Sequence, residues 1–461
     1  MTKLAFFQDR QFFETMFRLA IPIIIQNIIM FSLNMVDIIM IGQLGETAVA
    51  AVGLADQIFF LMLLFMFGVG SGAAIFTAQY WGKRDIVHIQ QTLGLCLMIS
   101  LCGAIFFAII ALFFSEFALG IYTTDPEVIR LGSNYLQIVG LSYVAVATTV
   151  GYSSILRSIE QVKLPTIVSA IAIVINTSLN YVLIFGHFGF PALGVVGAAI
   201  ATAIARYLEC IMLLTIIYSQ KLALAATIPQ MINRDIAFIS KFFYTSAPVV
   251  LTEIGWSLGI TTYNIIYARI STDAIAAISI AATVERLAFV LFLGLGSAAA
   301  IMIGNLIGAG EVDRAFDSAK RFLIIVPITA SFVGMLLLAV SYYIPLFYQI
   351  SEAAVSYLGM ILFLAGLLLP LRMTNFTLFI GILRSGGDTR FSLILDVGAV
   401  WLIGVPMAYY GGFVLGLPVY WVYLMAASEE LFKVIIGLWR VFSRRWIHEL
   451  TEVNELIPPT A

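Results

Sequence analysis

The sequence predicts an all-α integral membrane protein with twelve transmembrane helices, arranged as two parallel six-helix lobes around a central cleft. Three observations predict this fold class: a very apolar composition, apolar runs of membrane-spanning length, and an internal repeat. Of the 461 residues, 61% are hydrophobic and 11% are charged, whereas soluble proteins carry about 25% charged residues. Because so few charged side chains cannot cover a water-exposed surface, most of the chain is expected to lie in lipid.

Apolar runs of spanning length follow one another along the whole chain, separated by short polar segments. Each run can cross a hydrocarbon core of about 30 Å as a helix that rises about 1.5 Å per residue. No long stretch alternates between apolar and polar residues, which excludes a membrane β-barrel. The runs cover residues 17–41, 51–80, 90–115, 128–152, 165–186, 193–218, 243–270, 275–307, 318–345, 355–381, 391–411 and 417–440.

Lysine and arginine indicate the orientation. With twelve spans, most of the 24 basic residues fall on the side that holds both termini. Cytoplasmic loops of membrane proteins carry an excess of positive charge. We therefore expect a multi-pass protein of the inner (plasma) membrane with both termini in the cytoplasm.

An internal repeat divides the chain into two halves. A shift of 226 residues places Pro22 on Pro248 and the string GVGSGAAI, at 68–75, on GLGSAAAI, at 294–301. Each half has an even number of spans, so both halves start on the same side of the membrane and are parallel repeats. The predicted parts are an N-terminal lobe at 1–218, a cytoplasmic linker at 219–241, a C-terminal lobe at 242–440 and a cytoplasmic tail at 441–461.

The first span contains the string MVDIIMIGQLG, and the second ends in GSGAAIFTAQYWGKRD, which GSAAAIMIGNLIGAGE echoes in the second half. These strings resemble those of the multidrug and toxic compound extrusion (MATE) transporters. The resemblance covers nearly the whole chain, in order. It implies a secondary antiporter that exports amphipathic, often cationic compounds in exchange for H⁺ or Na⁺. Because the larger transporter group includes lipid-linked precursor flippases, that function is the alternative.

Four oxygen-bearing side chains are predicted at similar depth in the outer half of the N-terminal lobe. A charge in hydrocarbon costs at least about 2.5–3.5 kcal/mol, which makes Asp37 of the first span a functional candidate. Asn176 and Asn180 lie four positions apart, on one face of the fifth span, and Thr202 lies in the sixth span. Hard cations bind several oxygen ligands, so these residues could hold Na⁺. A proton on Asp37 is the alternative ligand, and simple bonding between helices is the alternative role for the other three residues.

The resemblance adds to this interpretation of the four residues. It implies that they match a cation site of MATE transporters, in which the position of Asn180 is commonly an aspartate. The chain therefore lacks one carboxylate, and the loss of a formal charge should weaken Na⁺ binding. The coupling ion stays open between H⁺ and Na⁺, and no other cofactor is expected.

Glu253 is predicted near the middle of the seventh span, with no basic residue within helical reach in the sequence. We expect it to carry a proton or Na⁺, or to anchor a cationic substrate together with Asp37. Some MATE transporters carry an acid at this position, as the resemblance implies. Trp256 and Tyr263 follow on the same span and could stack on a flat cationic drug, although packing or lipid contact is favoured for any single aromatic residue.

Several other intramembrane charges are expected to have structural roles. Arg206 and Glu209 have i, i+3 spacing and are expected to neutralise each other. We expect structural pairing or snorkelling for Asp396 and for Glu429 and Glu430 near Lys433. No role is assigned to Glu285, Arg286 or Arg372.

Other classes of function fit the sequence poorly. The three histidines lie in loops or at span ends and no metal or nucleophile constellation appears, so we do not expect an enzyme. No G-x-x-x-x-G-K-[ST] stretch exists for a nucleotide-driven pump. A flippase cleft for an anionic headgroup should carry buried basic residues, whereas the central candidates here are acids. We expect a monomer whose partners are small amphipathic or cationic molecules and membrane lipid, with no nucleic acid.

Overall fold

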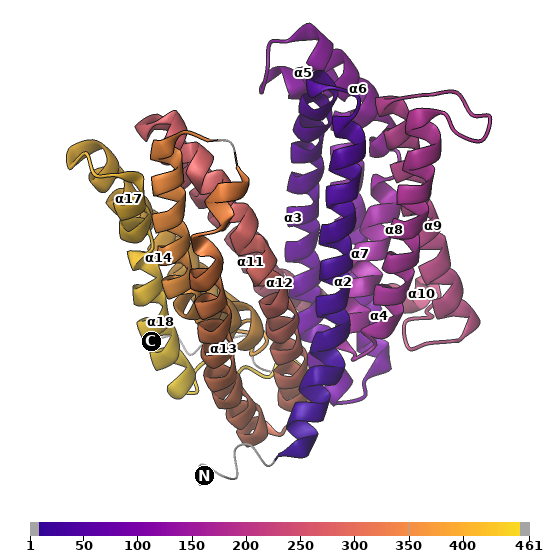
Figure 1. Ribbon diagram of the computed structural model, residues 1–461. Helices are drawn as coiled ribbons and strands as arrows, with labels where there is room; N and C mark the ends of the chain where they lie inside the picture. Colours follow the sequence, from indigo (N-terminus) through magenta and orange to yellow (C-terminus); the bar gives the residue numbers. More distant parts are fainter. Residues whose placement is uncertain (1–8, 349, 452–461) are drawn as a thin grey trace. The chain divides into compact units, whose positions relative to one another are not determined.

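The computed structural model describes residues 9–348 and 350–451 and is helical along almost its whole length (Figure 1). In these residues the β structure amounts to an isolated bridge between Gly387 and Ile447. The helices that precede the repeat boundary are α2 Arg10–Gly42, α3 Glu46–Gly82, α4 Ile86–Phe113, α5 Ser115–Gly120, α6 Pro126–Gly140, α7 Tyr143–Ser158, α8 Lys163–Phe185, α9 Val195–Ser219 and α10 Ile228–Met231.

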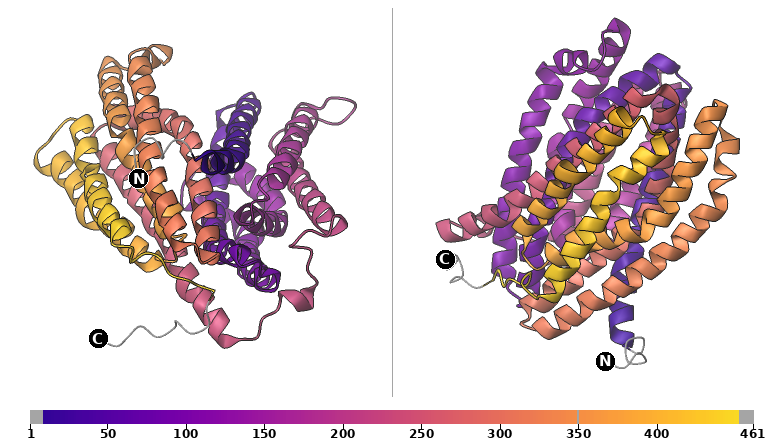
Figure 2. Two further views of the ribbon diagram at one scale, coloured as in Figure 1. Left: turned by 90° about the horizontal axis from the view of Figure 1, so that it is seen from below. Right: turned by 90° about the vertical axis from the view of Figure 1, so that its left-hand side faces the viewer.

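The second half repeats this helical pattern and adds short π-helical and 3-10 turns. The long helices α13 and α14 pack side by side (Figure 2). The elements are α11 Ile236–Ile270, α12 Thr272–Gly308, α13 Val312–Ser341, η1 Ile344–Phe347, α14 Glu352–Phe376, η2 Thr377–Leu383, α15 Thr389–Ala399, η3 Val400–Gly404, α16 Val405–Tyr409, η4 Tyr410–Val414, α17 Val419–Ala426 and α18 Ser428–Phe442.

Helices cover each of the twelve ranges that the sequence predicts as spans. In the described part of the chain, nine helices are long and apolar enough to cross a membrane, or ten if the bent pair α6 and α7 is one span. The protein is therefore a multi-pass membrane protein. Helix α11 and the α17–α18 pair lie over predicted spans but fall outside this group. Helix α11 carries Glu253 inside its apolar run, and α17 and α18, with 8 and 15 residues, are each too short to cross a membrane alone.

Local sequence explains where helices begin and end. The side chain of Asp125 accepts hydrogen bonds from the first backbone amides of α6, and Pro126 stands at the start of this helix. An N-terminal acid satisfies amides that have no partner within the helix, and proline there loses no hydrogen bond. Helix α8 ends at Gly186, whose φ of 76° lies in the left-handed region that glycine adopts without strain.

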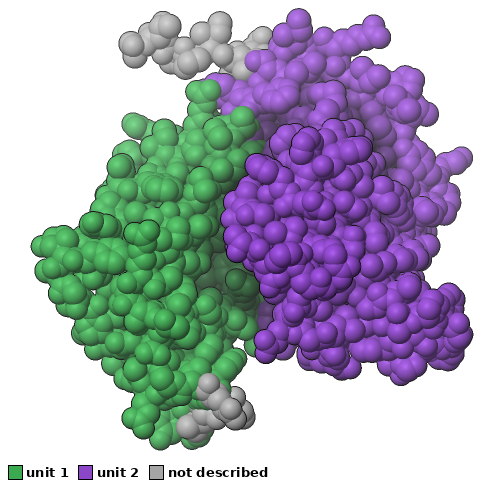
Figure 3. Space-filling view, turned by 90° about the horizontal axis from the view of Figure 1, so that it is seen from above, with its two compact units in different colours: residues 1–24, 247–461 green, residues 25–246 purple. Residues whose placement is uncertain are grey.

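The chain divides into two compact units (Figure 3). Unit 1 comprises Met1–Ile24 and Ala247–Ala461, and unit 2 comprises Ile25–Ser246. The boundaries fall inside α2 and α11, next to the internal prolines Pro22 and Pro248. Each unit has a hydrophobic core of its own.

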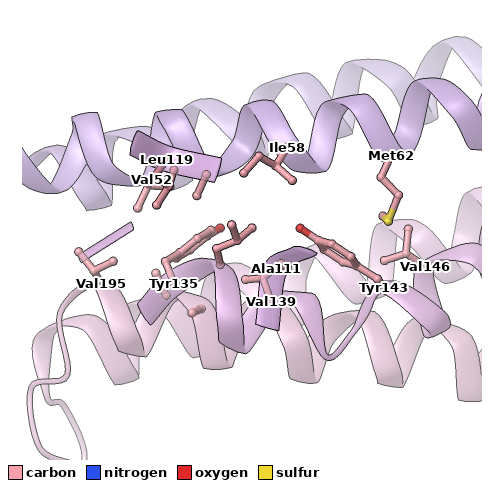
Figure 4. Packing of buried hydrophobic residues seen from close by; sticks show 14 of the residues in the cluster. Val52, Ile58, Met62, Ala111, Leu119, Tyr135, Val139, Tyr143, Val146 and Val195 are labelled. Carbon is pink, nitrogen blue, oxygen red and sulfur yellow. The ribbon is translucent and has the colours of Figure 1, made fainter. Parts of the chain in front are cut away.

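Aromatic and aliphatic side chains fill the core of unit 2. Val52, Ile58 and Met62 of α3 face Tyr135 of α6 and Tyr143 of α7 (Figure 4). The two tyrosines are 7% and 0% exposed, and their hydroxyls are directed into the space beside α3. The core thus brings polar atoms into the interior of the bundle, near the residues described below.

Candidate functional site

A chain of hydrogen bonds joins the four polar residues that the sequence predicts at similar depth. Asn180 Nδ2 donates to Asp37 Oδ1 at 2.9 Å and to Asn176 Oδ1 at 3.4 Å. Asn176 Nδ2 donates to Thr202 Oγ1 at 3.3 Å. The structure therefore brings together side chains from α2, α8 and α9, all within unit 2.

Asn180 lies at the centre of this chain and is 2% exposed. Its Nδ2 donates to a carboxylate oxygen of Asp37 and to the amide oxygen of Asn176, and these two acceptors determine which way the amide points. Its Oδ1 is then a buried acceptor without a hydrogen-bond partner in the described residues. Buried polar atoms are seldom left unpaired. An unpaired amide oxygen beside a carboxylate is a suitable ligand for a hard cation.

The donor set fits Na⁺. Asp37 offers a carboxylate, the two asparagines offer amide oxygens and Thr202 offers a hydroxyl, which are the ligand types that hard cations take. In the described part of the chain no group of three His, Cys, Asp or Glu residues could hold a metal ion. A cation here would therefore depend on the amide and hydroxyl oxygens as well as on Asp37.

The turn between α8 and α9 determines the depth at which the site residues meet. Leu193 N donates to Leu183 O at 2.9 Å, and Gly194 N donates to Ile184 O at 3.2 Å. These bonds tie the start of α9 to the end of α8. The two helices then pack against each other, which places Thr202 beside Asn176.

Two further residues, which are not among the predicted site residues, border the site. Asp56 of α3 lies close enough to Arg206 and Asp37 to interact electrostatically with both. Tyr135 of α6 lies beside Thr202. Asp56 is an acid inside the predicted span at 51–80, so the argument that selected Asp37 applies to it as well. Tyr135 had no such signal, because aromatic residues are common throughout the chain.

The predicted pairing of Arg206 with Glu209 is confirmed, at 3.2 Å between Nη1 and Oε2. Ser169 of α8 also donates to Glu209, at 2.6 Å. Glu209 is 5% exposed. This acid therefore has both a cation and a hydroxyl as partners.

Glu253 has a cationic partner that its sequence neighbourhood does not show. Arg384 Nη1 donates to Glu253 Oε1 at 2.7 Å, although 131 positions separate the two residues. Arg384 is 3% exposed, so the pair is buried within unit 1. Any role of Glu253 in holding a proton, Na⁺ or a cationic substrate would require this pair to loosen.

The two aromatic candidates on α11 lie in different surroundings. Trp256 is 42% exposed and available for stacking. Tyr263 is buried, and its hydroxyl donates to Glu429 Oε2 at 3.0 Å. Tyr263 is therefore held inside unit 1 by a polar contact.

Two further groups of intramembrane charges contain ion pairs. Lys433 Nζ contacts Asp396 Oδ1 at 2.8 Å and Glu429 Oε1 at 3.4 Å, which confirms the predicted pairing. Arg372 Nη1 donates to Glu285 Oε2 at 2.8 Å. Both groups lie in unit 1.

A surface cleft of about 580 Å³ lies in unit 2, between α2 and α8. Apolar side chains line most of it, with Gln43 and His187 as polar members. Val36 and Met40 belong to its lining, whereas Asp37 does not. The cleft is therefore a separate feature from the hydrogen-bonded site.

A polar site inside a bundle of membrane-spanning helices is typical of membrane transport proteins. The MatE family model matches residues 22–182 and again residues 248–410. The chain belongs to this family of MATE transporters. The two matches begin 226 residues apart, which is the shift of the internal repeat.

Similar proteins extend over almost the whole chain. The uncharacterized transporter YisQ of Bacillus subtilis is 25% identical over 445 residues, which cover 94% of this chain and 95% of YisQ. A probable multidrug resistance protein NorM of Rhizobium meliloti is 26% identical over 411 residues, with 88% and 87% covered.

Solved structures share the fold. The Vibrio cholerae MATE transporter VcmN, in a substituted form, superimposes with a TM-score of 0.86 at 19% identity, covering 96% of this chain and 99% of VcmN. A MOP superfamily transporter from Pyrococcus furiosus gives a TM-score of 0.83 at 20% identity, with 93% and 95% covered.

Proposed function

We propose that this protein is a secondary active antiporter that exports amphipathic, often cationic drugs or toxic compounds in exchange for H⁺ or Na⁺. Membership of the MatE family and the likeness to proteins named as probable multidrug resistance proteins support the export of drugs. The single observation that carries ion coupling is the hydrogen bond from Asn180 to Asp37, beside the unpartnered Asn180 Oδ1.

The coupling ion would bind at the Asp37 group. A carboxylate inside a membrane-spanning helix bundle gains most from a cation or proton that neutralises it. Asp37, Asn176, Asn180 and Thr202 would hold Na⁺, and Asp37 alone would hold a proton. Binding of either ion alters the hydrogen bonds that Asn180 makes to α2 and to its own helix, so ion binding would change how α2 is held against α8.

The same proposal includes the membrane topology. Twelve spans would form two parallel six-helix lobes around a central cleft, at 1–218 and 242–440, joined by the linker at 219–241 and followed by the tail at 441–461. Helices over all twelve ranges and the two matches to one family model support this arrangement. Both termini would be cytoplasmic, and the transporter would act as a monomer in the plasma membrane.

Substrate would contact acids and exposed aromatic residues. Asp37 and Glu253 would attract a cationic group, and Trp256 offers an exposed ring for stacking. The flippase alternative needs buried cations that are free to bind an anionic headgroup. Three basic residues of unit 1, namely Arg384, Arg372 and Lys433, each contact an acid. These pairs favour the antiporter.

The proposal is tested with the full-length protein in liposomes loaded with a fluorescent cation. A Na⁺ gradient and a H⁺ gradient are imposed separately, and loss of the dye is recorded. We expect efflux with at least one gradient and no efflux with Asp37→Asn. The control variant Glu116→Gln changes an exposed acid of α5 and should transport normally. Full efflux by Asp37→Asn would refute the coupling role of this site.

A further inference from the structure

We propose that unit 1 contains a second ion-binding site, at which Glu429 and Glu430 of α18 together bind one proton. This site goes beyond the proposed coupling at Asp37 and does not depend on it. Three features of unit 1 support it: an excess of carboxylates over cations, an amide oxygen that lacks a donor, and a close approach of the backbone to one of the two carboxylates.

The first observation is that acids outnumber bases in one connected group of buried and half-buried side chains. The group contains twice as many carboxylates as cations. Its carboxylates are those of Glu285, Asp396, Glu429 and Glu430, and its cations are Arg372 and Lys433.

Each cation in this group lies closer to another acid than to Glu429 or Glu430. Arg372 Nη1 lies 2.8 Å from Glu285 Oε2, and Tyr423 donates to the other oxygen of Glu285 at 2.6 Å. Lys433 Nζ lies 2.8 Å from Asp396 Oδ1 but 3.4 Å from Glu429 Oε1. Glu429 therefore has only a share of one ammonium group.

Glu429 and Glu430 are the acids that this pairing leaves short of positive charge. Glu429 is 6% exposed, and its second oxygen accepts a hydrogen bond from Tyr263 at 3.0 Å. Glu430 follows it in the chain, and its Oε2 accepts a hydrogen bond from Asn375 at 2.7 Å. A buried carboxylate without a full counter-charge is costly, and taking up a proton removes that cost.

The second observation is an amide oxygen without a donor. Asn375 is 3% exposed, and its Nδ2 donates at 2.7 Å both to the backbone oxygen of Glu430 and to Glu430 Oε2. These two acceptors determine which way the amide points. Asn375 Oδ1 then has no hydrogen-bond partner in the described residues. A proton on the carboxyl group of Glu430 would supply the missing donor.

The third observation is a close approach of backbone to the Glu429 carboxylate. A Cβ atom at Gly404 would lie 1.8 Å from the Tyr263 hydroxyl and 2.6 Å from Glu429 Oε2. Gly404 ends the π-helical turn η3, and such turns are frequent at functional sites. Only glycine leaves room here for the Tyr263–Glu429 hydrogen bond.

Proton binding is the chemistry that these groups favour. One O–H bond forms on a carboxylate oxygen and one O–H bond of a hydronium ion breaks, which leaves a water molecule, so no other reactant is needed. Because the two acids are adjacent and share their surroundings, the proton belongs to the pair. The groups that influence it from the packed helices are Tyr263 and Tyr267 of α11, Glu285 of α12, Arg372 of α14, Asp396 of α15, Tyr423 of α17 and Lys433 of α18.

Infrared difference spectroscopy on the purified full-length protein tests this site. Spectra are recorded between acidic and alkaline pH in the Asp37→Asn background, which removes the other proposed proton site. We expect a carboxylic acid C=O band that Glu429→Gln and Glu430→Gln each abolish, because either change removes one excess negative charge. The control Glu116→Gln should keep the band.

Three results would overturn the proposal. The first is the absence of the band in the Asp37→Asn protein, and the second is its persistence in either glutamine variant. The third is calorimetric Na⁺ binding to the Asp37→Asn protein that Glu429→Gln abolishes, which would identify the ligand as Na⁺. Failure of dye efflux alone affects only the proposed function.

Tyr263→Phe keeps the test decisive if a glutamine variant does not fold. It retains both carboxylates and removes one hydrogen bond to Glu429. We expect the band to remain at a shifted frequency. Loss of the band in this variant, although both carboxylates remain, would overturn the proposal.

Discussion

Glu253 and Arg384 form a buried ion pair, with 2.7 Å between Oε1 and Nη1. The pair joins α11 to the segment that follows η2, within unit 1. Because both charges are removed from water, loss of either partner should destabilise the fold, since the remaining charge would be buried without a counter-charge.

We therefore predict that Arg384→Met destabilises the protein by about 3–5 kcal/mol. The double variant Glu253→Gln/Arg384→Met should recover much of this loss, since no lone charge remains. Thermal unfolding in detergent measures both effects. Arg130→Met, which breaks the exposed pair with Glu127, is the control and should leave the melting temperature unchanged. Equal losses in the single and double variants would contradict the prediction.

Asn180→Asp restores a second carboxylate beside Asp37. Because the added charge lies where Asn180 Nδ2 now meets Asp37 Oδ1 at 2.9 Å, we expect Na⁺ to bind more tightly. A gain of about tenfold corresponds to about 1.4 kcal/mol. Calorimetric titration with Na⁺ at constant pH measures it, and Asn180→Ala should bind Na⁺ more weakly than the unsubstituted protein. Weaker binding by Asn180→Asp would argue against a cation at this position.

Asp56 tests how far the site extends along α3. It lies close enough to Asp37 and Arg206 to interact with both charges, and it accepts no recorded hydrogen bond from the four site residues. Asp56→Asn should therefore slow dye efflux several-fold without abolishing it, whereas Asp37→Asn abolishes it. An unaltered rate in Asp56→Asn would place this acid outside the coupling site.

Two glycines of the same segment provide a matched pair. Gly404→Ala forces apart the Tyr263 hydroxyl and Glu429, while a Cβ at Gly398 meets nothing within 4 Å. We expect Gly404→Ala to lower the melting temperature. Gly398→Ala should be neutral or raise it, because alanine favours a helix over glycine by about 1 kcal/mol. Similar melting temperatures for the two variants would show that a Cβ atom at Gly404 does not destabilise the fold.

Asp9 provides a pH-dependent contribution to stability outside the membrane spans. The hydrogen bond from Arg321 at 2.5 Å, followed by that from the Phe12 amide, holds the pKa of the Asp9 carboxyl below its ordinary value. The pair therefore stabilises the folded state above the unfolded pKa of about 4, and this contribution is lost as the pH falls through the lower folded pKa.

Asp9→Asn keeps a side-chain oxygen for the Phe12 amide and removes only the charge. Asp9 is 40% exposed, so we expect a loss below about 1 kcal/mol at neutral pH. Melting curves at several pH values should show the difference from the unsubstituted protein shrinking below about pH 4. A difference that is constant with pH would refute the ion pair.

Apolar run length was sufficient to locate the helices. All twelve predicted ranges lie on helices, because a long apolar segment in lipid must satisfy its backbone internally. The break between α6 and α7, which bends the pair by 53°, lacks the proline that would have signalled it. The number of membrane crossings and the boundaries of the lobes remain predictions.

Short-range spacing predicted local contacts and missed distant ones. The i, i+4 relation of Asn176 and Asn180 and the i, i+3 relation of Arg206 and Glu209 are both visible in the sequence, and both contacts form. Arg384 lies 131 positions from Glu253, so their contact becomes visible only when the helices are packed together in the structure. Long-range ion pairs depend on helix packing, which no local pattern encodes.

The boundary of unit 1 inside α2 has a consequence for biosynthesis. Residues 10–24 are translated before the rest of unit 1, but Phe12 packs against Phe322, at 5.4 Å between ring centroids. The Asp9–Arg321 pair likewise joins residues 312 positions apart. Residues 10–24 therefore meet these neighbours only after about 300 further residues have been translated. A nascent chain that stops after α10 exposes an apolar helix start whose partners do not yet exist, and unit 1 closes only when α13 has been inserted.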